Sequence, residues 1–269
     1  MKLNLKTLAA VAGLASTLIL TGCGQEEAKT NSIKVGVMAG AEAQVAEVAA
    51  KVAKEQYGLD VELVTFTDYV TPNAALDDGS IDLNAFQHKP YLDQQVTDRG
   101  YKIEIAGNSF VYPIAGYSKQ VTSVDQIEDG ARIAVPNDPT NLGRSLLLLQ
   151  EQGLITLRDG SGLAATVRDI TANPKNITIV ELDAAQLPRS LDDVALSVIN
   201  TTYASSLNLT PEKDGIFVED KDSPYVNLIV GRTDNVNTEN VKTFVKAYQS
   251  EDVYQAALKT FKGGVVKGW

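Results

Sequence analysis

The side chains best suited to holding a small molecule cluster around the single histidine of the chain. His88 lies two residues after Phe86 and three residues before Tyr91. The predicted strand 81–86 delivers this cluster to the edge of a sheet, where ligands of open α/β sheets bind. Aromatic rings contact sulfur favourably, by about 0.3–1.5 kcal/mol each, so the cluster suits a thioether. Tyr69, after another predicted strand, is placed to close the same pocket, and core aromatics beside a surface histidine are the competing interpretation.

Arg144 is the second candidate, because the sequence places it in the first turn of a helix predicted at residues 142–150. Asn141 stands near the N-cap, and free backbone N–H groups at such a helix end bind anions. A guanidinium grips a carboxylate through two parallel hydrogen bonds. The helix dipole alone favours an acid in this turn, so a cation there indicates a bound carboxylate. A surface arginine paired with a nearby Asp or Glu is the alternative.

Two asparagines occupy positions that strands disfavour. Asn200 ends the apolar strand predicted at residues 194–199, and Asn227 lies inside the strand predicted at residues 225–230. Amide oxygens accept hydrogen bonds from an ammonium group, although a turn residue is the alternative for Asn200. Together, a thioether pocket, a carboxylate site and amide acceptors favour a receptor for a free amino acid.

The remaining chemistry of the sequence argues against an enzyme. No G-x-S-x-G elbow supports a Ser-His-Asp site, and no His/Cys/Asp spacing resembles a zinc site. The formal net charge is -10 and no basic run appears, which disfavours nucleic acid because phosphate contacts need clustered Lys and Arg. We therefore expect no catalytic residues, no metal, no cofactor and no nucleic-acid partner.

Strands and helices alternate along the chain, which predicts an α/β fold with largely parallel sheets. A helix at residues 41–57, for example, has apolar residues at helical spacing and ends before Gly58, a favoured C-terminal cap. The residues that follow the N-terminal segment suffice for one large domain or for two lobes.

Two segments are predicted to connect one lobe to the other. Residues 109–118 form an extended stretch that is long for one strand, and residues 215–219 are placed to cross back. This arrangement predicts one lobe of residues 32–112 plus 216–269, a second lobe of residues 113–215, and a ligand cleft between them. A single doubly wound sheet is the alternative.

The N-terminus has the features of an exported, lipid-modified protein. Two lysines precede an apolar run at residues 8–20, which is short for a transmembrane helix and predicts a signal peptide at residues 1–22. The next residues complete a Leu-Thr-Gly-Cys sequence that looks like a lipobox, so we expect lipid on Cys23 and a polar tether at residues 23–31. An ordinary signal peptide with a chance cysteine is the alternative.

Long runs of the sequence resemble the NlpA family of bacterial lipoproteins, in particular the binding lipoproteins of methionine ABC importers. The resemblance covers nearly the whole chain. The runs that carry it are residues 20–23, 58–66, 84–95, 110–117, 135–150, 186–193, 199–205, 215–230 and 267–269.

The resemblance implies a two-lobed periplasmic-binding-protein fold of the type II-like class, which shuts on methionine and presents it to an inner-membrane ABC permease with its ATPase. It also implies an aromatic wall for the thioether, an arginine for the α-carboxylate with an asparagine beside it, and asparagines for the amino group and backbone. The matching positions are Tyr69, Phe86, His88 and Tyr91 for the wall, Arg144 with Asn141 for the carboxylate, and Asn200 and Asn227 for the amino group and backbone.

The same resemblance places the protein in the bacterial cell envelope, facing the periplasm and anchored through Cys23. D-methionine or a methionine-containing dipeptide is the nearest alternative ligand, and an envelope lipoprotein for adhesion or maintenance is the alternative class. Removing Arg144 is expected to leave the fold intact and to weaken methionine binding at least about tenfold.

Overall fold

The structure is a computed structural model that describes residues 31–220 and 223–269. The signal peptide predicted at residues 1–22, the lipid site Cys23, and all but the last residue of the tether predicted at residues 23–31 lie outside the described residues. Within the described ranges, no helix is both long enough and apolar enough to span a membrane.

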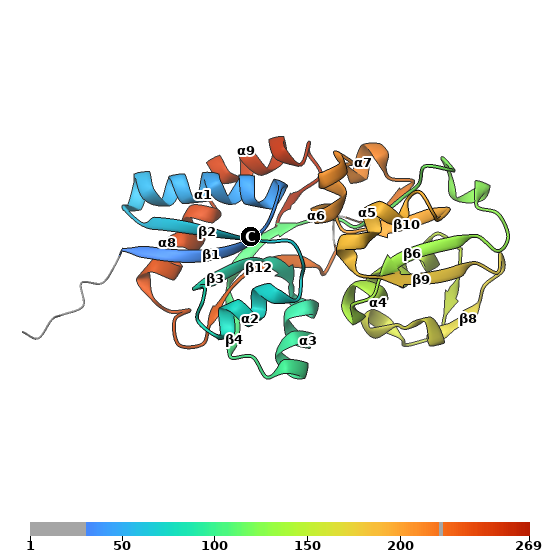
Figure 1. Ribbon diagram of the computed structural model, residues 1–269, viewed down its shortest axis with the longest axis horizontal. Helices are drawn as coiled ribbons and strands as arrows, with labels where there is room; N and C mark the ends of the chain where they lie inside the picture. The colour runs from blue at the N-terminus through green and yellow to red at the C-terminus, as the bar shows by residue number, and fades with distance from the viewer. Residues whose placement is uncertain (1–30, 221–222) are drawn as a thin grey trace, which may run out of the picture. The chain divides into compact units, whose positions relative to one another are not determined.

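Two main β-sheets organise the described chain, so the alternative of a single doubly wound sheet is wrong (Figure 1). The first sheet has the strand order β13-β4-β12-β3-β1-β2. Its strands are β1 (Ser32–Met38), β2 (Asp60–Phe66), β3 (Leu83–His88), β4 (Ile103–Val111), β12 (Val226–Arg232) and β13 (Val266–Lys267).

The first sheet is mixed, which corrects the prediction of largely parallel sheets. β1 pairs in parallel with β2 and β3, but β12 is antiparallel to both β3 and β4, and β13 is antiparallel to β4. The physical reason is that β12 returns from the second sheet and enters the first sheet between two strands that are already present.

Helices cover both faces of the first sheet (Figure 1). Successive residues of β12 point to opposite faces, so Ile229 joins one buried cluster whereas Leu228 and Val230 join another. The cluster around Ile229 includes residues of α1 (Ala41–Tyr57), α8 (Glu239–Tyr248) and α9 (Glu251–Thr260), and the cluster around Leu228 includes residues of α2 (Thr71–Asp77) and α3 (Lys89–Arg99).

The helix predicted at residues 41–57 is confirmed as α1. Gly58 ends it in the left-handed conformation with φ of 68°, and its N–H bonds the carbonyl oxygens of Ala53 and Lys54. Glycine reaches this conformation without steric cost, which explains why the helix ends here.

The second sheet has the strand order β11-β5-β10-β6-β9. β9 and β10 run parallel to β6, whereas β5 is antiparallel to β10 and β11. These strands are β5 (Ala115–Tyr117), β6 (Arg132–Pro136), β9 (Thr178–Leu182), β10 (Leu196–Ile199) and β11 (Phe217–Val218); a separate hairpin joins β7 (Thr156–Leu157) to β8 (Ile170–Ala172).

The main helix packed on the second sheet is α4, which spans Pro139–Glu151. Leu142, Leu146 and Leu149 of this helix belong to the apolar core of the sheet. Three helices of four residues each lie in the connections, and they are α5 (Leu187–Ser190), α6 (Thr201–Ala204) and α7 (Pro211–Asp214).

The chain passes from the first sheet to the second between β4 and β5, and it returns between β11 and β12. Phe217 pairs with Gly116 and Val218 pairs with Ala115, so the second crossing comes after Val218 rather than at residues 215–216. We therefore keep the division into two lobes as a proposal, with the second lobe extended to Val218.

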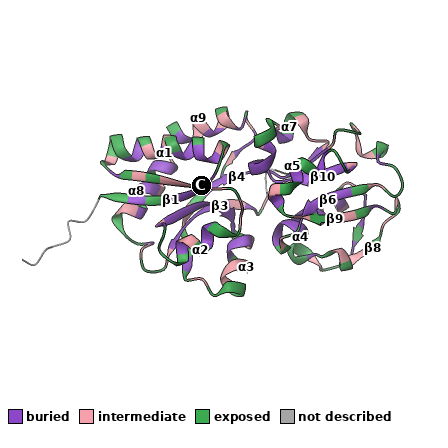
Figure 2. Ribbon diagram, in the orientation of Figure 1, coloured by how far each residue is buried: buried purple, intermediate pink, exposed green. Residues whose placement is uncertain are grey.

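The strands that lead to the candidate site are deeply buried. β3 and β10 are buried along their whole length (Figure 2). β3 ends at His88 and passes directly into α3, while β10 ends at Ile199, immediately before Asn200. Side chains at the carboxyl ends of these strands are therefore held by rigid, close-packed elements.

Candidate functional site

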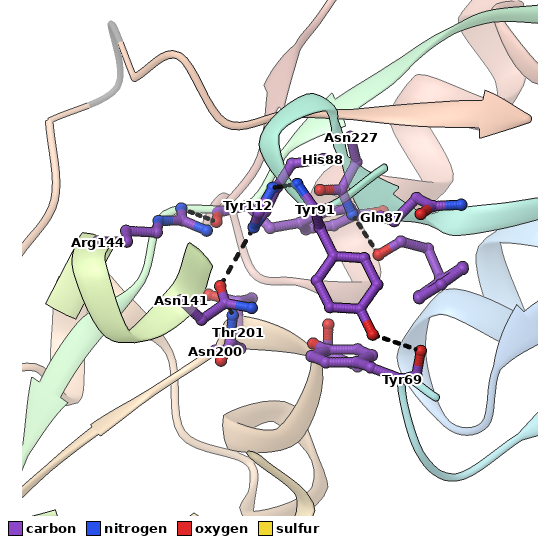
Figure 3. Close-up of a pocket in the computed structure, with 12 residues that line it drawn as sticks. Tyr69, Gln87, His88, Tyr91, Tyr112, Asn141, Arg144, Asn200, Thr201 and Asn227 are labelled. Atoms are coloured by element: carbon purple, nitrogen blue, oxygen red, sulfur yellow. Dashed lines mark hydrogen bonds between the residues drawn. The ribbon is translucent and has the colours of Figure 1, made fainter. Parts of the chain in front are cut away.

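A cavity that is partly open to solvent lies where the carboxyl ends of β3 and β10 meet (Figure 3). Aromatic rings, a guanidinium and amide groups line it, and such a combination of an apolar wall with a few polar groups is typical of sites for small molecules. All eight predicted ligand-binding residues line it, and they are Tyr69, Phe86, His88, Tyr91, Asn141, Arg144, Asn200 and Asn227. Four other lining residues were not predicted from the sequence, and they are Gln87, Tyr112, Thr201 and Thr202.

One end of the cavity is aromatic. The rings of Tyr69 and Phe86 lie 5.8 Å apart, those of Phe86 and Tyr91 lie 6.0 Å apart, and those of Tyr69 and Tyr91 lie 6.2 Å apart. The hydroxyl of Tyr91 donates to the backbone oxygen of Tyr69 at 2.8 Å, and Tyr203 from α6 packs on Tyr69 at 4.9 Å. These rings are therefore both part of a buried cluster and part of the cavity wall, so the two interpretations of the sequence are compatible.

His88 lines the cavity with its ring and also makes two hydrogen bonds through its ring nitrogens. Its Nδ1 accepts from the backbone N–H of Tyr91 at 3.1 Å, so His88 caps the N-terminus of α3. The ring proton then belongs on Nε2, which lies 3.2 Å from Oδ1 of Asn141. Burial, followed by the nearby charge of Arg144, lowers the pKa of His88 from 6.5 to about 3. His88 is therefore neutral and joins the first sheet to a helix of the second.

Helix α4 begins three residues earlier than the sequence analysis predicted, because Asp138 rather than Asn141 is its N-cap. The Asp138 carboxylate accepts from the backbone N–H of Asn141 at 2.9 Å, and Pro139 occupies the first helical position, which its fixed φ favours. Arg144 consequently lies in the second turn. The helix end is also occupied by a carboxylate of the chain itself, so the prediction of a free anion site there is wrong.

Arg144 is 4% exposed and already has a carboxylate partner. Its Nε donates to Oε1 of Glu219 at 2.7 Å, and its Nη2 donates both to Oε2 of Glu219 and to the backbone oxygen of Tyr112, the latter at 3.0 Å. The ring of Tyr225 covers the guanidinium, with its centroid 4.2 Å from Cζ. The alternative of an ion pair with an acid is therefore correct, except that the pair is buried rather than exposed.

This arrangement changes how Arg144 can hold a ligand. The edge formed by Nε and Nη2, which suits a carboxylate best, is taken by Glu219. In the described part of the chain, Nη1 donates to no acceptor and is the nitrogen left for a bound anion. Glu219 and Tyr225 had no signal in the sequence, since 75 and 81 residues separate them from Arg144 (219 - 144 and 225 - 144).

The two asparagines present amide oxygens at the cavity. Asn200 donates through Nδ2 to Oδ1 of Asn141 at 2.9 Å, and its own buried Oδ1 has no partner in the described chain. Asn227 donates to the backbone oxygen of Phe86 at 3.0 Å and pairs with His88 in the sheet. Asn200 makes no side-chain cap for α6, so the turn alternative does not explain its side chain.

A second buried carboxylate, Glu42 in the first turn of α1, contacts the wall of the cavity from behind. The hydroxyl of Thr202 donates to Oε1 of Glu42 at 2.5 Å, and Glu42 is 2% exposed. Burial raises the pKa of Glu42 from 4.5 to about 8, although the hydrogen bond from Thr202 acts in the opposite direction. This residue was not predicted from the sequence, because an acid in a first turn is usually exposed.

The described residues contain no group of three or more His, Cys, Asp or Glu that could hold a metal ion. The geometry defines the class first: an α/β protein with two sheets and a cavity lined by aromatic, amide and charged side chains, as in solute-binding proteins. Comparison with known proteins then identifies the family.

The family model of the NlpA lipoproteins matches residues 33–269. A Vibrio cholerae protein named probable D-methionine-binding lipoprotein MetQ is 74% identical over 269 residues, which covers 100% of both chains. The crystal structure of the methionine-binding protein MetQ has a TM-score of 0.88 and 71% identity, and the match covers 89% of this chain and 99% of that one. A nutrient-binding protein from Burkholderia cenocepacia bound to methionine has a TM-score of 0.86 and 53% identity, over 88% of this chain and 100% of that one.

This chain belongs to the NlpA lipoprotein family. The predicted two-lobed, type II-like periplasmic-binding-protein fold is confirmed by these structures and by that of a periplasmic substrate-binding protein from Coxiella burnetii. Its relatives are substrate-binding transport proteins rather than enzymes.

Proposed function

We propose that this protein binds free methionine in the cavity and presents it to an ABC importer. The observation that carries the proposal is the pairing of an aromatic end with a guanidinium end in one cavity. Relatives at 53–74% identity are named for methionine or are bound to it, which supports the same ligand.

The polar end suits the two charges of an amino acid. In this proposal the α-carboxylate accepts from Nη1 of Arg144, a charge-assisted hydrogen bond that contributes about 1.5–3 kcal/mol. The α-ammonium donates to amide oxygens, for which the unpartnered Oδ1 of Asn200 and the neighbouring Asn227 are the candidates. Asn141 positions the side chains of His88 and Asn200, because its Oδ1 accepts a hydrogen bond from each.

The aromatic end suits the thioether. Tyr69, Phe86 and Tyr91 enclose a site from which a methionine side chain would displace water, contributing about 1.5–3 kcal/mol. Sulfur also contacts ring edges favourably. The neutral ring of His88 completes the wall without adding a charge.

Contacts that join the two sheets supply a basis for closure around the ligand. Nε2 of His88 meets Asn141, the hydroxyl of Thr202 meets Glu42, and the hydroxyl of Tyr203 meets the backbone oxygen of Thr67 at 3.4 Å. In the proposed cycle these contacts break as the lobes open by hinge motion and re-form when methionine bridges them. The hinge lies in the two crossings between the sheets.

The proposal also covers the partners and location of the protein. Lipid on Cys23 would anchor it in the bacterial envelope, facing the periplasm, where the closed form would meet an inner-membrane permease with its ATPase. A polar tether at residues 23–31 would let the folded part reach that partner. No catalytic step is proposed.

Thermal unfolding in the presence of single amino acids and dipeptides tests the ligand. A ligand that binds only the folded state raises the melting temperature, so methionine should raise it, with D-methionine, L-methionine and a methionine-containing dipeptide compared at equal concentration. Norleucine, which replaces the sulfur by a methylene, is the matched control and should bind more weakly.

Mass spectrometry of small molecules released from the denatured protein provides an independent check. We expect methionine in the extract. If nothing co-purifies and no amino acid or dipeptide stabilises the fold, the protein is not a solute receptor, and a role in adhesion or envelope maintenance becomes the better explanation.

A further inference from the structure

Glu219 is the one acidic side chain that touches the guanidinium of Arg144 in the described residues, and its position is fixed. It exchanges hydrogen bonds with Ile114: its backbone N–H donates to the Ile114 carbonyl oxygen at 3.0 Å, and its Oε2 accepts from the Ile114 N–H at 3.4 Å. Its side chain is 12% exposed. Arg144 lies in α4, which packs on the second sheet, and Glu219 directly follows β11 of that sheet.

The ion pair leaves the cavity without net positive charge. Arg144 and Glu219 cancel each other, and His88 is neutral because burial and the Arg144 charge lower its pKa. Asp138 lies just outside the wall and bonds Asn141, which adds negative rather than positive charge nearby. A site built only to attract carboxylates would leave the guanidinium unpaired, as electrostatic attraction grows with net charge.

The few free N–H donors of Arg144 also disfavour a ligand that offers only a carboxylate. Glu219 and the Tyr112 carbonyl use Nε and Nη2, and the Tyr225 ring covers one face of the guanidinium. A ligand carboxylate is therefore restricted to Nη1 and cannot form the two parallel bonds that make such pairs strong. Binding then depends on the ligand's ammonium as well as on its carboxylate.

We propose that Glu219 is a specificity-determining residue that makes this cavity select a zwitterion over an anion with the same side chain. It does so by occupying the preferred edge of Arg144 and by cancelling its charge. This inference rests on the proposed function, since it assumes that methionine is the ligand. It extends that proposal by assigning the discrimination among thioether compounds to one carboxylate.

Calorimetric titration with three ligands that share the thioether side chain tests the inference. They are methionine, its deamino analogue, which keeps only the carboxylate, and its decarboxylated analogue, which keeps only the ammonium. In the unaltered protein we expect methionine to bind at least about a hundredfold more tightly than the deamino analogue, because the ammonium contacts are lost and no net positive charge compensates.

The decisive variant is Glu219→Gln, which keeps the size and one acceptor of the side chain but removes its charge. The preference for methionine over the deamino analogue should fall by about tenfold or more, and the decarboxylated analogue should bind more weakly than before, because Arg144 now presents a net positive charge. Glu219→Asp, which keeps the charge, should leave the preference within about threefold of the original value.

Glu62→Gln is the matched control, since Glu62 is an exposed carboxylate on β2 and its removal changes the formal charge equally. It should leave all three affinities unchanged. An unchanged preference in Glu219→Gln would overturn the inference while leaving methionine binding intact. If Glu219→Gln does not fold, the unaltered protein still decides: binding of the deamino analogue within about threefold of methionine would also overturn it. Failure of methionine itself to bind would instead refute the proposed function.

Discussion

Two carboxylates near the cavity, the largely buried Glu219 and the buried Glu42, have different partners. Glu219 faces a guanidinium on two of its nitrogens. Glu42 has no cationic partner among the described residues, and its hydrogen-bond donor is the hydroxyl of Thr202. Burial therefore raises the pKa of Glu42 to about 8, which keeps it protonated at neutral pH.

The same fold stabilises a buried carboxyl group in two different ways. A carboxylate is costly to bury unless a cation compensates it or a proton neutralises it. The end of the cavity that must hold a charged ligand keeps an ion pair, whereas the wall behind Thr202 keeps a neutral acid. Charge is thus concentrated where the ligand's own charges are proposed to bind.

Removing the guanidinium of Arg144 should have the largest effect on stability and on methionine binding. Arg144→Ala leaves the largely buried Glu219 carboxylate without its cation, and breaking one member of a buried pair costs about 3–5 kcal/mol. We expect urea denaturation to show that loss in the free energy of unfolding, so the earlier expectation of an intact fold is revised. Calorimetry on the folded fraction should show at least a tenfold loss in methionine affinity, or about 1.4 kcal/mol.

The double variant Arg144→Leu with Glu219→Leu removes both charges and serves as the control. Replacing a buried ion pair by apolar residues of similar volume is often close to neutral for stability. A double variant as unstable as Arg144→Ala would contradict the view that the unpaired Glu219 carboxylate causes the loss.

The protonated carboxyl group of Glu42 should make the stability of the protein depend on pH. Between pH 4.5 and 8 the folded protein holds a proton on Glu42 that the unfolded chain releases, so its stability falls as pH rises. Because one pKa unit corresponds to about 1.4 kcal/mol, we expect a loss of roughly 1.5–2 kcal/mol from pH 6.5 to pH 8. Glu42→Gln, which mimics the protonated acid, should remove that loss when denaturation is measured at both pH values.

His88 changes the stability with pH in the opposite direction to Glu42, and it does so over a lower pH range. Its pKa is about 3 in the folded protein against an ordinary value of 6.5, so the stability it contributes is lost as pH falls from 6.5 toward 3. Above pH 6.5 little of this His88 effect remains, so the effect of Glu42 dominates there. Equal pH dependence in Glu42→Gln and the unaltered protein would mean that Glu42 is already ionised at pH 6.5.

A smaller effect is expected at the donor to Glu42. Thr202→Val keeps the shape of the side chain but deletes the hydroxyl, and loss of one such hydrogen bond costs about 0.5–1.5 kcal/mol. Because that bond lowers the pKa of Glu42, its removal should also shift the alkaline fall in stability to higher pH. Denaturation at several pH values between 6.5 and 9 measures both; a shift to lower pH would be inconsistent with the assigned bond.

The smallest effect should come from an ion pair in solvent. Lys54 and Asp60 lie 2.7 Å apart, but their side chains are 58% and 63% exposed. Lys54→Ala should therefore lower the free energy of unfolding by less than about 1 kcal/mol. A loss comparable to that in Arg144→Ala would mean that burial does not distinguish the pairs.

The sequence predicted the aromatic end of the cavity well because its residues are close along the chain. Phe86, His88 and Tyr91 lie on one strand and the helix that follows it, so a strand followed by a proline-initiated helix suffices to bring them together. The other five residues were candidates from their places at predicted strands and at a predicted helix start, the resemblance to a family favoured the same residues, and all eight line the cavity.

One error had a local signal that was available. Asp138 and Pro139 form a favoured N-cap and first position of a helix, and they place the start of α4 correctly. Starting the helix at Leu142 instead put Arg144 one turn too early and left an anion site where Asp138 already binds.

The sequence by itself determined the alternating α/β elements, the apolar faces that pack them and the short-range cluster around His88, because each depends on spacing along the chain. Only the tertiary structure decided which carboxylate meets Arg144 and which one is left to be neutralised by a proton. Those pairings depend on distances in space between segments that fold together from far apart, and no pattern of neighbouring residues encodes such distances.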